Sequence, residues 1–271
     1  MKKYKRVLSI AGSDSGGGAG IQADLKTFSS LACYGSTVVT ALTAQNTTGV
    51  KAVFEVPVSF VEKQIDAVIQ DIGADAVKIG MLWSGELIEA VAVIIKKYDL
   101  KNIVVDPVMA SQSGDSLVKD DIASALMKHL LPIATVFTPN LPEAEKMLGY
   151  NICKLRDMER AAHDFTDAGC EHVLIKGGHL DGDECVDVYL SSHKKDCVFF
   201  RERRINTVNN HGTGCTLSSA IAACLAKGHS PDNAVAKAKK YITSALSAGA
   251  DFKIGKGSGP VLHFYENTSL F

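Results

Sequence analysis

A glycine-bracketed segment carries the residue types in this chain that are best suited to chemistry. Residues 209–216 read NNHGTGCT, and small helix-forming residues, LSSAIAA, follow at 217–223. Gly212 and Gly214 allow the backbone to approach a ligand closely. The free N–H groups and positive dipole end of a helix starting here would bind an anion. Cys215 stands at the same turn, where a thiol can have a lowered pKa. The segment indicates phosphoryl transfer, and a plain glycine loop with a buried cysteine is the alternative.

A second glycine-rich segment precedes the first expected helix. Residues 12–20 read GSDSGGGAG, which matches neither a P-loop nor the dinucleotide-binding pattern. It can admit a small ligand to the backbone or serve only as a tight turn. Asp24 follows it and either complements a helix dipole or accepts hydrogen bonds from a substrate. Gln45 offers a donor and an acceptor that suit the edge of an aminopyrimidine, or it is a polar loop residue.

Polar residues also follow three later strands. Asp106 ends one apolar run, and Asn140 and Glu143 follow another. Their oxygens suit Mg²⁺, but Asn140 and Glu143 also fit a helix-capping box. Lys176 ends a further run and is either a partner for polyphosphate or a solvated lysine before a turn.

The elements that must position these residues alternate along the chain. Apolar runs predict strands at 7–10, 36–42, 77–79, 103–105, 136–138, 173–176, 186–190 and 198–201. Helices are expected at 20–31, 59–70, 86–97, 121–131, 158–168, 216–227 and 233–248. This alternation indicates an α/β fold with a mostly parallel sheet covered on both faces. Ligands of such sheets bind beyond the carboxyl ends of the strands, where the polar residues above are expected.

Composition narrows the class of protein. The chain has 271 residues, so one domain spanning 1–271 is expected. The formal net charge of −1 gives no indication of nucleic acid or an anionic membrane as partner. Seven cysteines without a Cys-x-x-Cys pair argue against a disulfide framework and for a reducing compartment. No apolar run reaches the length of about 18 residues that spans a bilayer, so a cytoplasmic protein is expected.

Six segments together resemble the ribokinase-like superfamily and, within it, the bacterial hydroxymethylpyrimidine/phosphomethylpyrimidine kinases of thiamine biosynthesis. They are AGSDSGGGAGIQADLK at 11–26, TALTAQNT at 40–47, KIGML at 78–82, VDPVM at 105–109, TPNLPEA at 138–144 and HGTGCT at 211–216. The resemblance implies a three-layer sandwich and an ATP-dependent kinase that phosphorylates a hydroxymethylpyrimidine and then its monophosphate.

The resemblance also implies a substrate pocket. Its expected residues are Gly12, Ala19, Asp24, Gln45, Met81 and Val108. Asp24 and Gln45 would be the polar contacts of the pyrimidine.

Catalytic and nucleotide-binding roles are implied for the other segments. The backbone of Gly212, Thr213, Gly214 and Cys215 would form an anion hole. Most of the superfamily has an aspartate base at the position of Cys215. The pyrimidine-kinase branch and a related pyridoxal kinase group have a cysteine there instead, as this chain does.

ATP and Mg²⁺ are the implied cofactors. Asn140 and Lys176 would hold ATP together with the two loop glycines, and Asp106 and Glu143 would hold Mg²⁺.

Members with a strand lid carry extra sequence between the first strand and its helix, and this chain has no room for one. Residues 53–56 are instead expected in a flap or a subunit contact, which favours a homodimer. Pyridoxal kinase activity is the nearest alternative, and a ligand-binding sensor without turnover is the remote one. Gln45 favours the aminopyrimidine over pyridoxal.

Overall fold

The strands form one mixed sheet. The computed structural model describes residues 3–109, 122–178, 180 and 182–266, which contain nine strands in a single sheet. They are β1 (Arg6–Asp14), β2 (Tyr34–Asn46), β3 (Gly49–Glu55), β4 (Ala76–Ile79), β5 (Ile103–Val105), β6 (Val136–Phe137), β7 (His172–Ile175), β8 (Glu184–Ser191) and β9 (Val198–Arg203). Their order in space is β3-β2-β1-β4-β5-β6-β7-β8-β9. Pairing is parallel from β2 through β7 and antiparallel at both edges.

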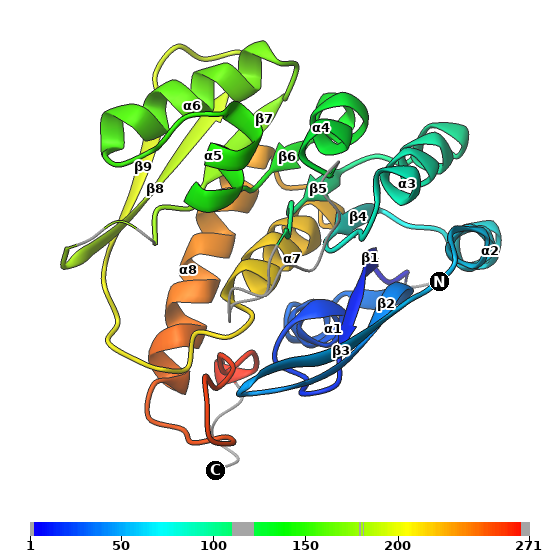
Figure 1. Ribbon diagram of the computed structural model, residues 1–271, viewed down its shortest axis with the longest axis horizontal. Coiled ribbons are helices and arrows are strands. Elements are labelled where there is room, and N and C mark those ends of the chain that lie inside the picture. The colour runs from blue at the N-terminus through cyan, green and yellow to red at the C-terminus, as the bar shows by residue number, and fades with distance from the viewer. Residues whose placement is uncertain (1–2, 110–121, 179, 181, 267–271) are drawn as a thin grey trace.

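Helices cover both faces of this sheet (Figure 1). They are α1 (Gly20–Ser30), α2 (Val58–Asp71), α3 (Gly85–Lys97), α4 (Ile122–Ala125), α5 (Leu141–Leu148), α6 (Leu155–Asp167), α7 (Thr213–Ala226) and α8 (Pro231–Gly249). One apolar core joins the sheet to α2 through α6, and a second core joins it to α1, α7 and α8. The structure therefore has the predicted α/β sandwich, and its described residues form no separate lid.

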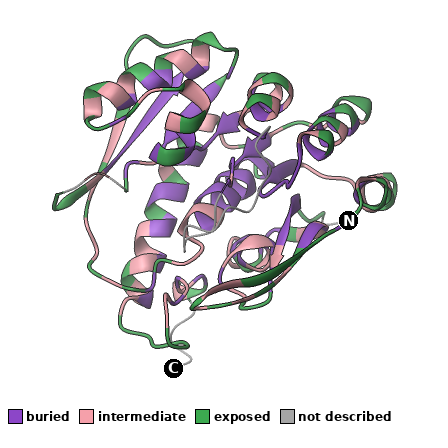
Figure 2. Ribbon diagram, in the orientation of Figure 1, coloured by how far each residue is buried: buried purple, intermediate pink, exposed green. Residues whose placement is uncertain are grey.

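The central strands and α7 are buried (Figure 2). Strands β4, β5 and β7 consist almost wholly of buried residues because helices cover both of their faces. From Thr216 to Ala226, every residue of α7 is buried, which explains its run of alanine and serine. Small side chains let α7 lie close to the sheet, so that its first turn reaches the strand ends.

Two strands near one edge of the sheet, β1 and β2, are longer than predicted. β1 continues to Asp14 and β2 to Asn46, because the two strands pair in parallel past a bulge between Ala11 and Ser13. Gln45 therefore lies at the end of a strand and not in a loop. β3 includes residues 53–55 of the expected flap and pairs only with β2, where Val53 and Phe54 are exposed.

Several helix boundaries differ from the prediction, and α6 begins at Leu155, three residues earlier than expected. The helix expected at 121–131 begins in the structure at Ile122, and Asp121 lies outside the described residues. It changes to a π-helical turn at Leu126–Leu130 and a 3₁₀ turn at Leu131–Ile133, because Pro132 has no N–H for an α-helical hydrogen bond. α7 begins at Thr213, three residues earlier than expected, and includes Cys215 in its first turn. Among the described helices, none has both the length and the hydropathy needed to cross a bilayer.

Candidate active site

A cavity of about 1000 Å³ opens beyond the carboxyl ends of the parallel strands. All but one of the predicted site residues line it, namely Gly12, Ala19, Gln45, Met81, Asp106, Val108, Asn140, Glu143, Lys176, Gly212, Thr213, Gly214 and Cys215. They come from seven separate segments of the chain. The position of these residues agrees with the rule that α/β sheets bind ligands at this edge.

The anion loop, residues 211–215, forms the floor of this cavity. Gly212 is the N-cap of α7 and has a φ of 78°, a left-handed conformation that favours glycine. The next N–H groups, at Gly214 and Cys215, belong to the first helical turn, which has no acceptors within the helix. A Cβ placed on Gly214 would lie 3.4 Å from Lys176 Nζ and 3.6 Å from Asp106 Oδ2. Helix N–H groups and a cation thus face the same space, as an anion site requires.

The pKa of the Cys215 thiol is raised, whereas the sequence analysis allowed for a lowered one. Burial raises the pKa of the Cys215 thiol to about 11, and the charges of Asp24 and Asp106 add to this effect. The Lys78 ammonium and a hydrogen bond from the Gly20 N–H act in the opposite direction. Desolvation outweighs these two effects, because a thiolate loses more from leaving water than it gains from the nearby ammonium and N–H group. The thiol is therefore protonated at neutral pH.

Asp106, Lys176 and Glu143 form a charged group on one wall. Lys176 Nζ lies 2.6 Å from Asp106 Oδ1 and 3.9 Å from Glu143 Oε2. Burial opposes the charge on Asp106, but Lys176 and Lys78 hold the pKa of its carboxyl below the ordinary value. Burial raises the pKa of Glu143 to about 7, although Lys176 counteracts it. Ser218, on α7, also donates to Asp106.

The structure confirms the capping-box interpretation of Asn140 and Glu143. Asn140 caps α5 through a bond from the Glu143 N–H, and Glu143 Oε2 accepts from the Asn140 N–H at 2.7 Å. This is the predicted capping box. The same carboxylate lies close to Lys176 at the cavity wall, so the cap also positions a charge in the site.

Asp24, the one predicted site residue outside the cavity lining, is occupied by contacts within the protein. Asp24 is fully buried on α1, outside the cavity lining. Its carboxylate accepts two hydrogen bonds from Lys78 Nζ, both at 3.0 Å, and one each from Ser9 and Ser219 at 2.6 Å. These four hydrogen bonds, donated by three side chains, occupy both oxygens of the carboxylate. Asp24 instead holds the buried ammonium of Lys78, which does line the cavity.

The part of the cavity predicted to hold the substrate ring is mostly apolar. Gly12 lies against Met81, since a Cβ added there would be 3.2 Å from the Met81 sulfur. Ala19 and Val108 line the same cavity, and Gln45 adds a primary amide. Small apolar walls with one amide suit a flat heteroaromatic ring.

Sequence reasoning missed several charged residues of this cavity, and three of them belong to buried carboxylate–ammonium pairs. Lys78 interrupts the apolar strand β4, and a lysine within such a strand was the available signal. Asp187 and Lys239 form a buried pair at 2.6 Å between β8 and α8. The Asp187 carboxylate also accepts from the Gly177 N–H, at the turn that follows Lys176. Nothing in their local sequence pattern distinguishes them.

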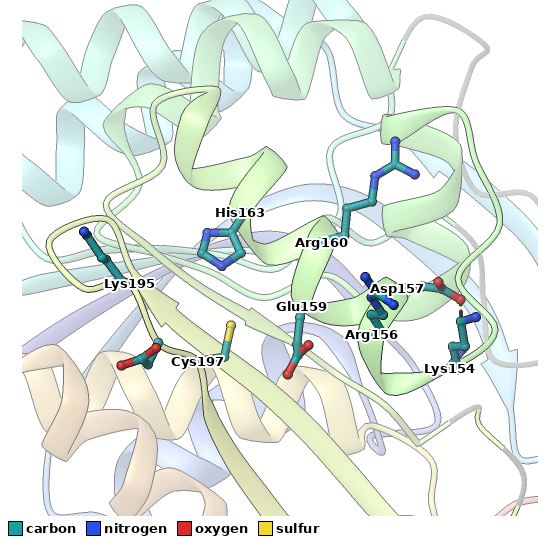
Figure 3. Close-up of a pocket in the computed structure, with 9 residues that line it drawn as sticks. Lys154, Arg156, Asp157, Glu159, Arg160, His163, Lys195 and Cys197 are labelled. Atoms are coloured by element: carbon teal, nitrogen blue, oxygen red, sulfur yellow. Dashed lines mark hydrogen bonds between the residues drawn. The ribbon is translucent and has the colours of Figure 1, made fainter.

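A second hollow, of about 660 Å³, lies along α6 and the start of β9 (Figure 3). Its residues are Lys154, Arg156, Asp157, Glu159, Arg160, His163, Lys195, Asp196 and Cys197. None of the predicted site residues belongs to it. Charged side chains of both signs surround it, and most of them are exposed.

Comparison with known proteins identifies the family. The sequence model described as phosphomethylpyrimidine kinase matches residues 14–262. The chain belongs to this family. It is 51% identical over 259 residues to the hydroxymethylpyrimidine/phosphomethylpyrimidine kinase of Rhizobium meliloti (strain 1021), which covers 95% of this chain and 96% of that protein.

Solved structures of two kinds resemble this member of the phosphomethylpyrimidine kinase family. The phosphomethylpyrimidine kinase of Clostridium difficile 630 is 47% identical with a TM-score of 0.78, covering 89% of this chain and 99% of that one. The pyridoxal kinase of Staphylococcus aureus, in complex with AMP-PCP and pyridoxal, is 38% identical with a TM-score of 0.89, covering 98% and 96%. The comparisons confirm the expected ribokinase-like sandwich.

The contact between Gly212 and the glycine-rich segment generates a first prediction. A Cβ at Gly212 would lie 1.8 Å from the Gly18 carbonyl oxygen. Gly212→Ala is expected to displace either the anion loop or the segment that contains Gly18. The displacement should lower kcat/KM for the hydroxymethylpyrimidine and for its monophosphate. Gly228→Ala is the matched control, because Gly228 also has a positive φ but no atom within 4 Å of the added Cβ. Equal losses in steady-state assays of the two variants would contradict the prediction.

The buried Asp24–Lys78 pair generates a second prediction. Lys78→Met leaves the Asp24 carboxylate buried without its cation, so the free energy of unfolding should fall by about 3–5 kcal/mol. Urea unfolding followed by circular dichroism measures the change. The double variant Asp24→Asn/Lys78→Met removes both charges and should recover part of the loss. Additive losses would argue against a coupled pair.

The raised pKa of Cys215 generates a third prediction. Because the folded pKa is about 11 against an ordinary 9.0, the thiolate fraction at pH 8 should be roughly a hundredfold lower in the folded chain than in the unfolded chain. Alkylation of Cys215 by iodoacetamide should be slow at pH 8 and accelerate up to that pKa. Mass spectrometry follows the labelling, with exposed Cys153 as the reagent control. Rapid folded-state labelling at pH 7 would contradict it.

Proposed function

We propose that this protein is an ATP-dependent kinase of 4-amino-5-hydroxymethyl-2-methylpyrimidine that also converts the monophosphate product to the pyrophosphate. The supporting observation is the meeting of the anion loop, Cys215 and the Asp106–Lys176 pair around one cavity. Membership of the phosphomethylpyrimidine kinase family supports the same reaction.

ATP is the proposed phosphoryl donor, and its phosphates would lie between the anion loop and Lys176. The N–H groups of Gly214 and Cys215 and the Lys176 ammonium would neutralise charge on the transferred group without rearranging. The similar pyridoxal kinase of Staphylococcus aureus has been solved in complex with ADP and with AMP-PCP, which supports a nucleotide here.

The carboxylates of Asp106 and Glu143 fit Mg²⁺. No group of three His, Cys, Asp or Glu side chains among the described residues forms a complete protein metal cage. Mg²⁺ is commonly held by one or two carboxylates with phosphate oxygens and waters, and this pair meets that need. Mg²⁺ bound there would neutralise phosphate charge. Lys176 now compensates both carboxylates and would share them with the ion.

The substrate hydroxymethyl group would lie beside Cys215. Its oxygen forms the new bond to the γ-phosphorus as the bond to ADP breaks, and its proton passes to the Cys215 sulfur. The required thiolate is a minor species at neutral pH because burial raises the pKa of Cys215 to about 11. The Lys78 ammonium counteracts burial and favours the thiolate. A base that is scarce but correctly placed suits a reaction that needs mainly alignment.

Pyridoxal phosphorylation is the second candidate function. The similarity to a pyridoxal kinase with a TM-score of 0.89 favours it. Pyridoxal has a ring and a hydroxymethyl group of comparable size, so the cavity volume does not separate the two substrates. The Gln45 amide supports the aminopyrimidine, because that ring presents a donor and an acceptor on one edge.

A coupled assay of ADP release tests the proposal. Purified protein is supplied with ATP, Mg²⁺ and, in separate reactions, the hydroxymethylpyrimidine, its monophosphate or pyridoxal. The expected result is a larger kcat/KM for the two pyrimidines than for pyridoxal. A larger value for pyridoxal would support the second candidate, and no turnover with any of the three would refute both.

The role of Cys215 generates a fourth prediction. Cys215→Ala should lower kcat by about 10²–10⁴, the range for loss of a general base, while AMP-PCP affinity stays near the original value. Cys215→Ser should lose a similar factor, because a hydroxyl ionises even less readily than this thiol. Steady-state kinetics and calorimetry provide the two readouts. Full turnover by either variant would remove Cys215 from the mechanism.

We also propose a homodimer and a cytoplasmic location. Leu42, Val53 and Phe54 are exposed along β2 and β3, beside the unpaired edge of β3. Such an edge is commonly covered by another chain. All seven cysteines are free, which suits a reducing compartment.

The dimer generates a fifth prediction. Light scattering at micromolar concentration should give twice the chain mass, and Phe54→Glu should give the mass of one chain, because a charge would be buried in the contact. Val93→Glu is a control at an exposed apolar position on α3. A monomer in the original protein would refute the dimer.

A further inference from the structure

Asp14 organises the glycine loop, residues 15–19. Its carboxylate is buried at the end of β1 and accepts hydrogen bonds from three backbone N–H groups. Oδ1 accepts from Gly16 at 2.8 Å, and Oδ2 accepts from Gly18 at 3.0 Å and Ala19 at 2.9 Å. One side chain therefore sets the shape of the loop that forms the substrate side of the cavity.

The same carboxylate reaches the anion loop. His211 Nε2 lies 2.9 Å from Asp14 Oδ2, and the imidazole packs against Gly18, where an added Cβ would be 2.3 Å from His211 Cδ2. Gly212 touches the Gly18 carbonyl in the same way. The glycine loop and the anion loop are thus joined by the Asp14–His211 hydrogen bond and by the close approach of Gly18 and Gly212.

The Asp14–His211 bond defines which imidazole nitrogen carries a proton. Burial opposes the charge on Asp14, but His211 and the backbone N–H groups hold the pKa of its carboxyl below the ordinary value. An ionised carboxylate only accepts, so Nε2 of His211 must donate to it. Nε2 then offers no lone pair to other donors.

This polarity matters for Gln45. Its amide nitrogen lies 3.5 Å from His211 Nε2, and its Oε1 accepts from Thr43 Oγ1 at 3.2 Å. Ser15, in the glycine loop, holds the Gln45 backbone through two bonds of 2.8 Å. Because His211 Nε2 is a donor, it cannot accept from the Gln45 amide. The amide N–H groups are thus available to a ligand that brings an acceptor.

We propose that Asp14 and His211 are a positioning pair that keeps the Gln45 amide N–H groups available to a ring acceptor and joins the glycine loop to the anion loop. His211 thereby acts on substrate specificity through Gln45. This inference rests on the proposed function, since it takes the hydroxymethylpyrimidine as the ligand whose ring nitrogen is recognised.

Two substitutions at His211 test the pair. His211→Phe keeps a ring against Gly18 but removes the N–H, whereas His211→Gln keeps an N–H donor at a similar reach. His211→Phe should raise KM for the pyrimidine on the order of 10- to 100-fold, the range for a lost charge-assisted bond, with a smaller change in kcat. His211→Gln should restore most of the original KM. Equal defects in the two variants would overturn the proposal.

Substrate analogues provide a readout that a purely structural role would not change. Each ring nitrogen of the hydroxymethylpyrimidine is replaced by C–H in turn, and kcat/KM is compared with that of the parent. The original protein should reject one of the two analogues strongly, and His211→Phe should lose that discrimination. Discrimination that persists unchanged in His211→Phe would overturn the proposal.

Asp14→Asn provides the second variant, because it keeps the size of the side chain and removes the charge. Asp14→Asn should show the same loss of discrimination between the analogues. It therefore tests the proposal even if circular dichroism shows that His211→Phe does not fold. His229→Phe, outside the cavity, is the control for loss of an imidazole. If the original protein does not phosphorylate the pyrimidine, the proposed function fails. If it does and neither variant alters specificity, only this inference fails.

Discussion

The close packing of α7 against the sheet is the constraint on which the rest of the site depends. Its small, fully buried side chains let its first turn reach the carboxyl ends of the strands. The left-handed Gly212 then turns the chain into the helix beside the Gly18 carbonyl. An anion site follows, because N–H groups without helical acceptors face a cavity that also contains Lys176.

Buried charges around this turn are arranged in pairs. Asp24 with Lys78, Asp106 with Lys176 and Asp187 with Lys239 each place a carboxylate within 3 Å of an ammonium. Pairing makes the burial of charge tolerable, and it leaves ammonium groups at the cavity wall where phosphates would bind. The same burial keeps the Cys215 thiol protonated, so the site favours a bound anion over a resident thiolate.

Similarity to both pyrimidine and pyridoxal kinases fits this arrangement. The anion loop and the Asp106–Lys176 pair are suited to phosphate, whatever ring carries the hydroxyl group. Met81, Val108 and Gln45 line the same cavity, and in the proposed function the selection between rings depends on them. A common phosphate site beside a separate ring pocket, as proposed, would allow related chains to differ in substrate.

The sequence alone determined the α/β class, the strand ends that carry polar residues and the motifs that meet in the cavity, because periodicity and glycine spacing are local properties. It also predicted the capping box of Asn140 and Glu143. Only the tertiary structure decided the role of Asp24, since Ser9, Lys78 and Ser219 come to it from other elements. The pKa of Cys215 and the contact of Asp14 with His211 were decided in the same way. Desolvation and long-range pairing depend on what surrounds a side chain in space, and neighbours in sequence do not supply that information.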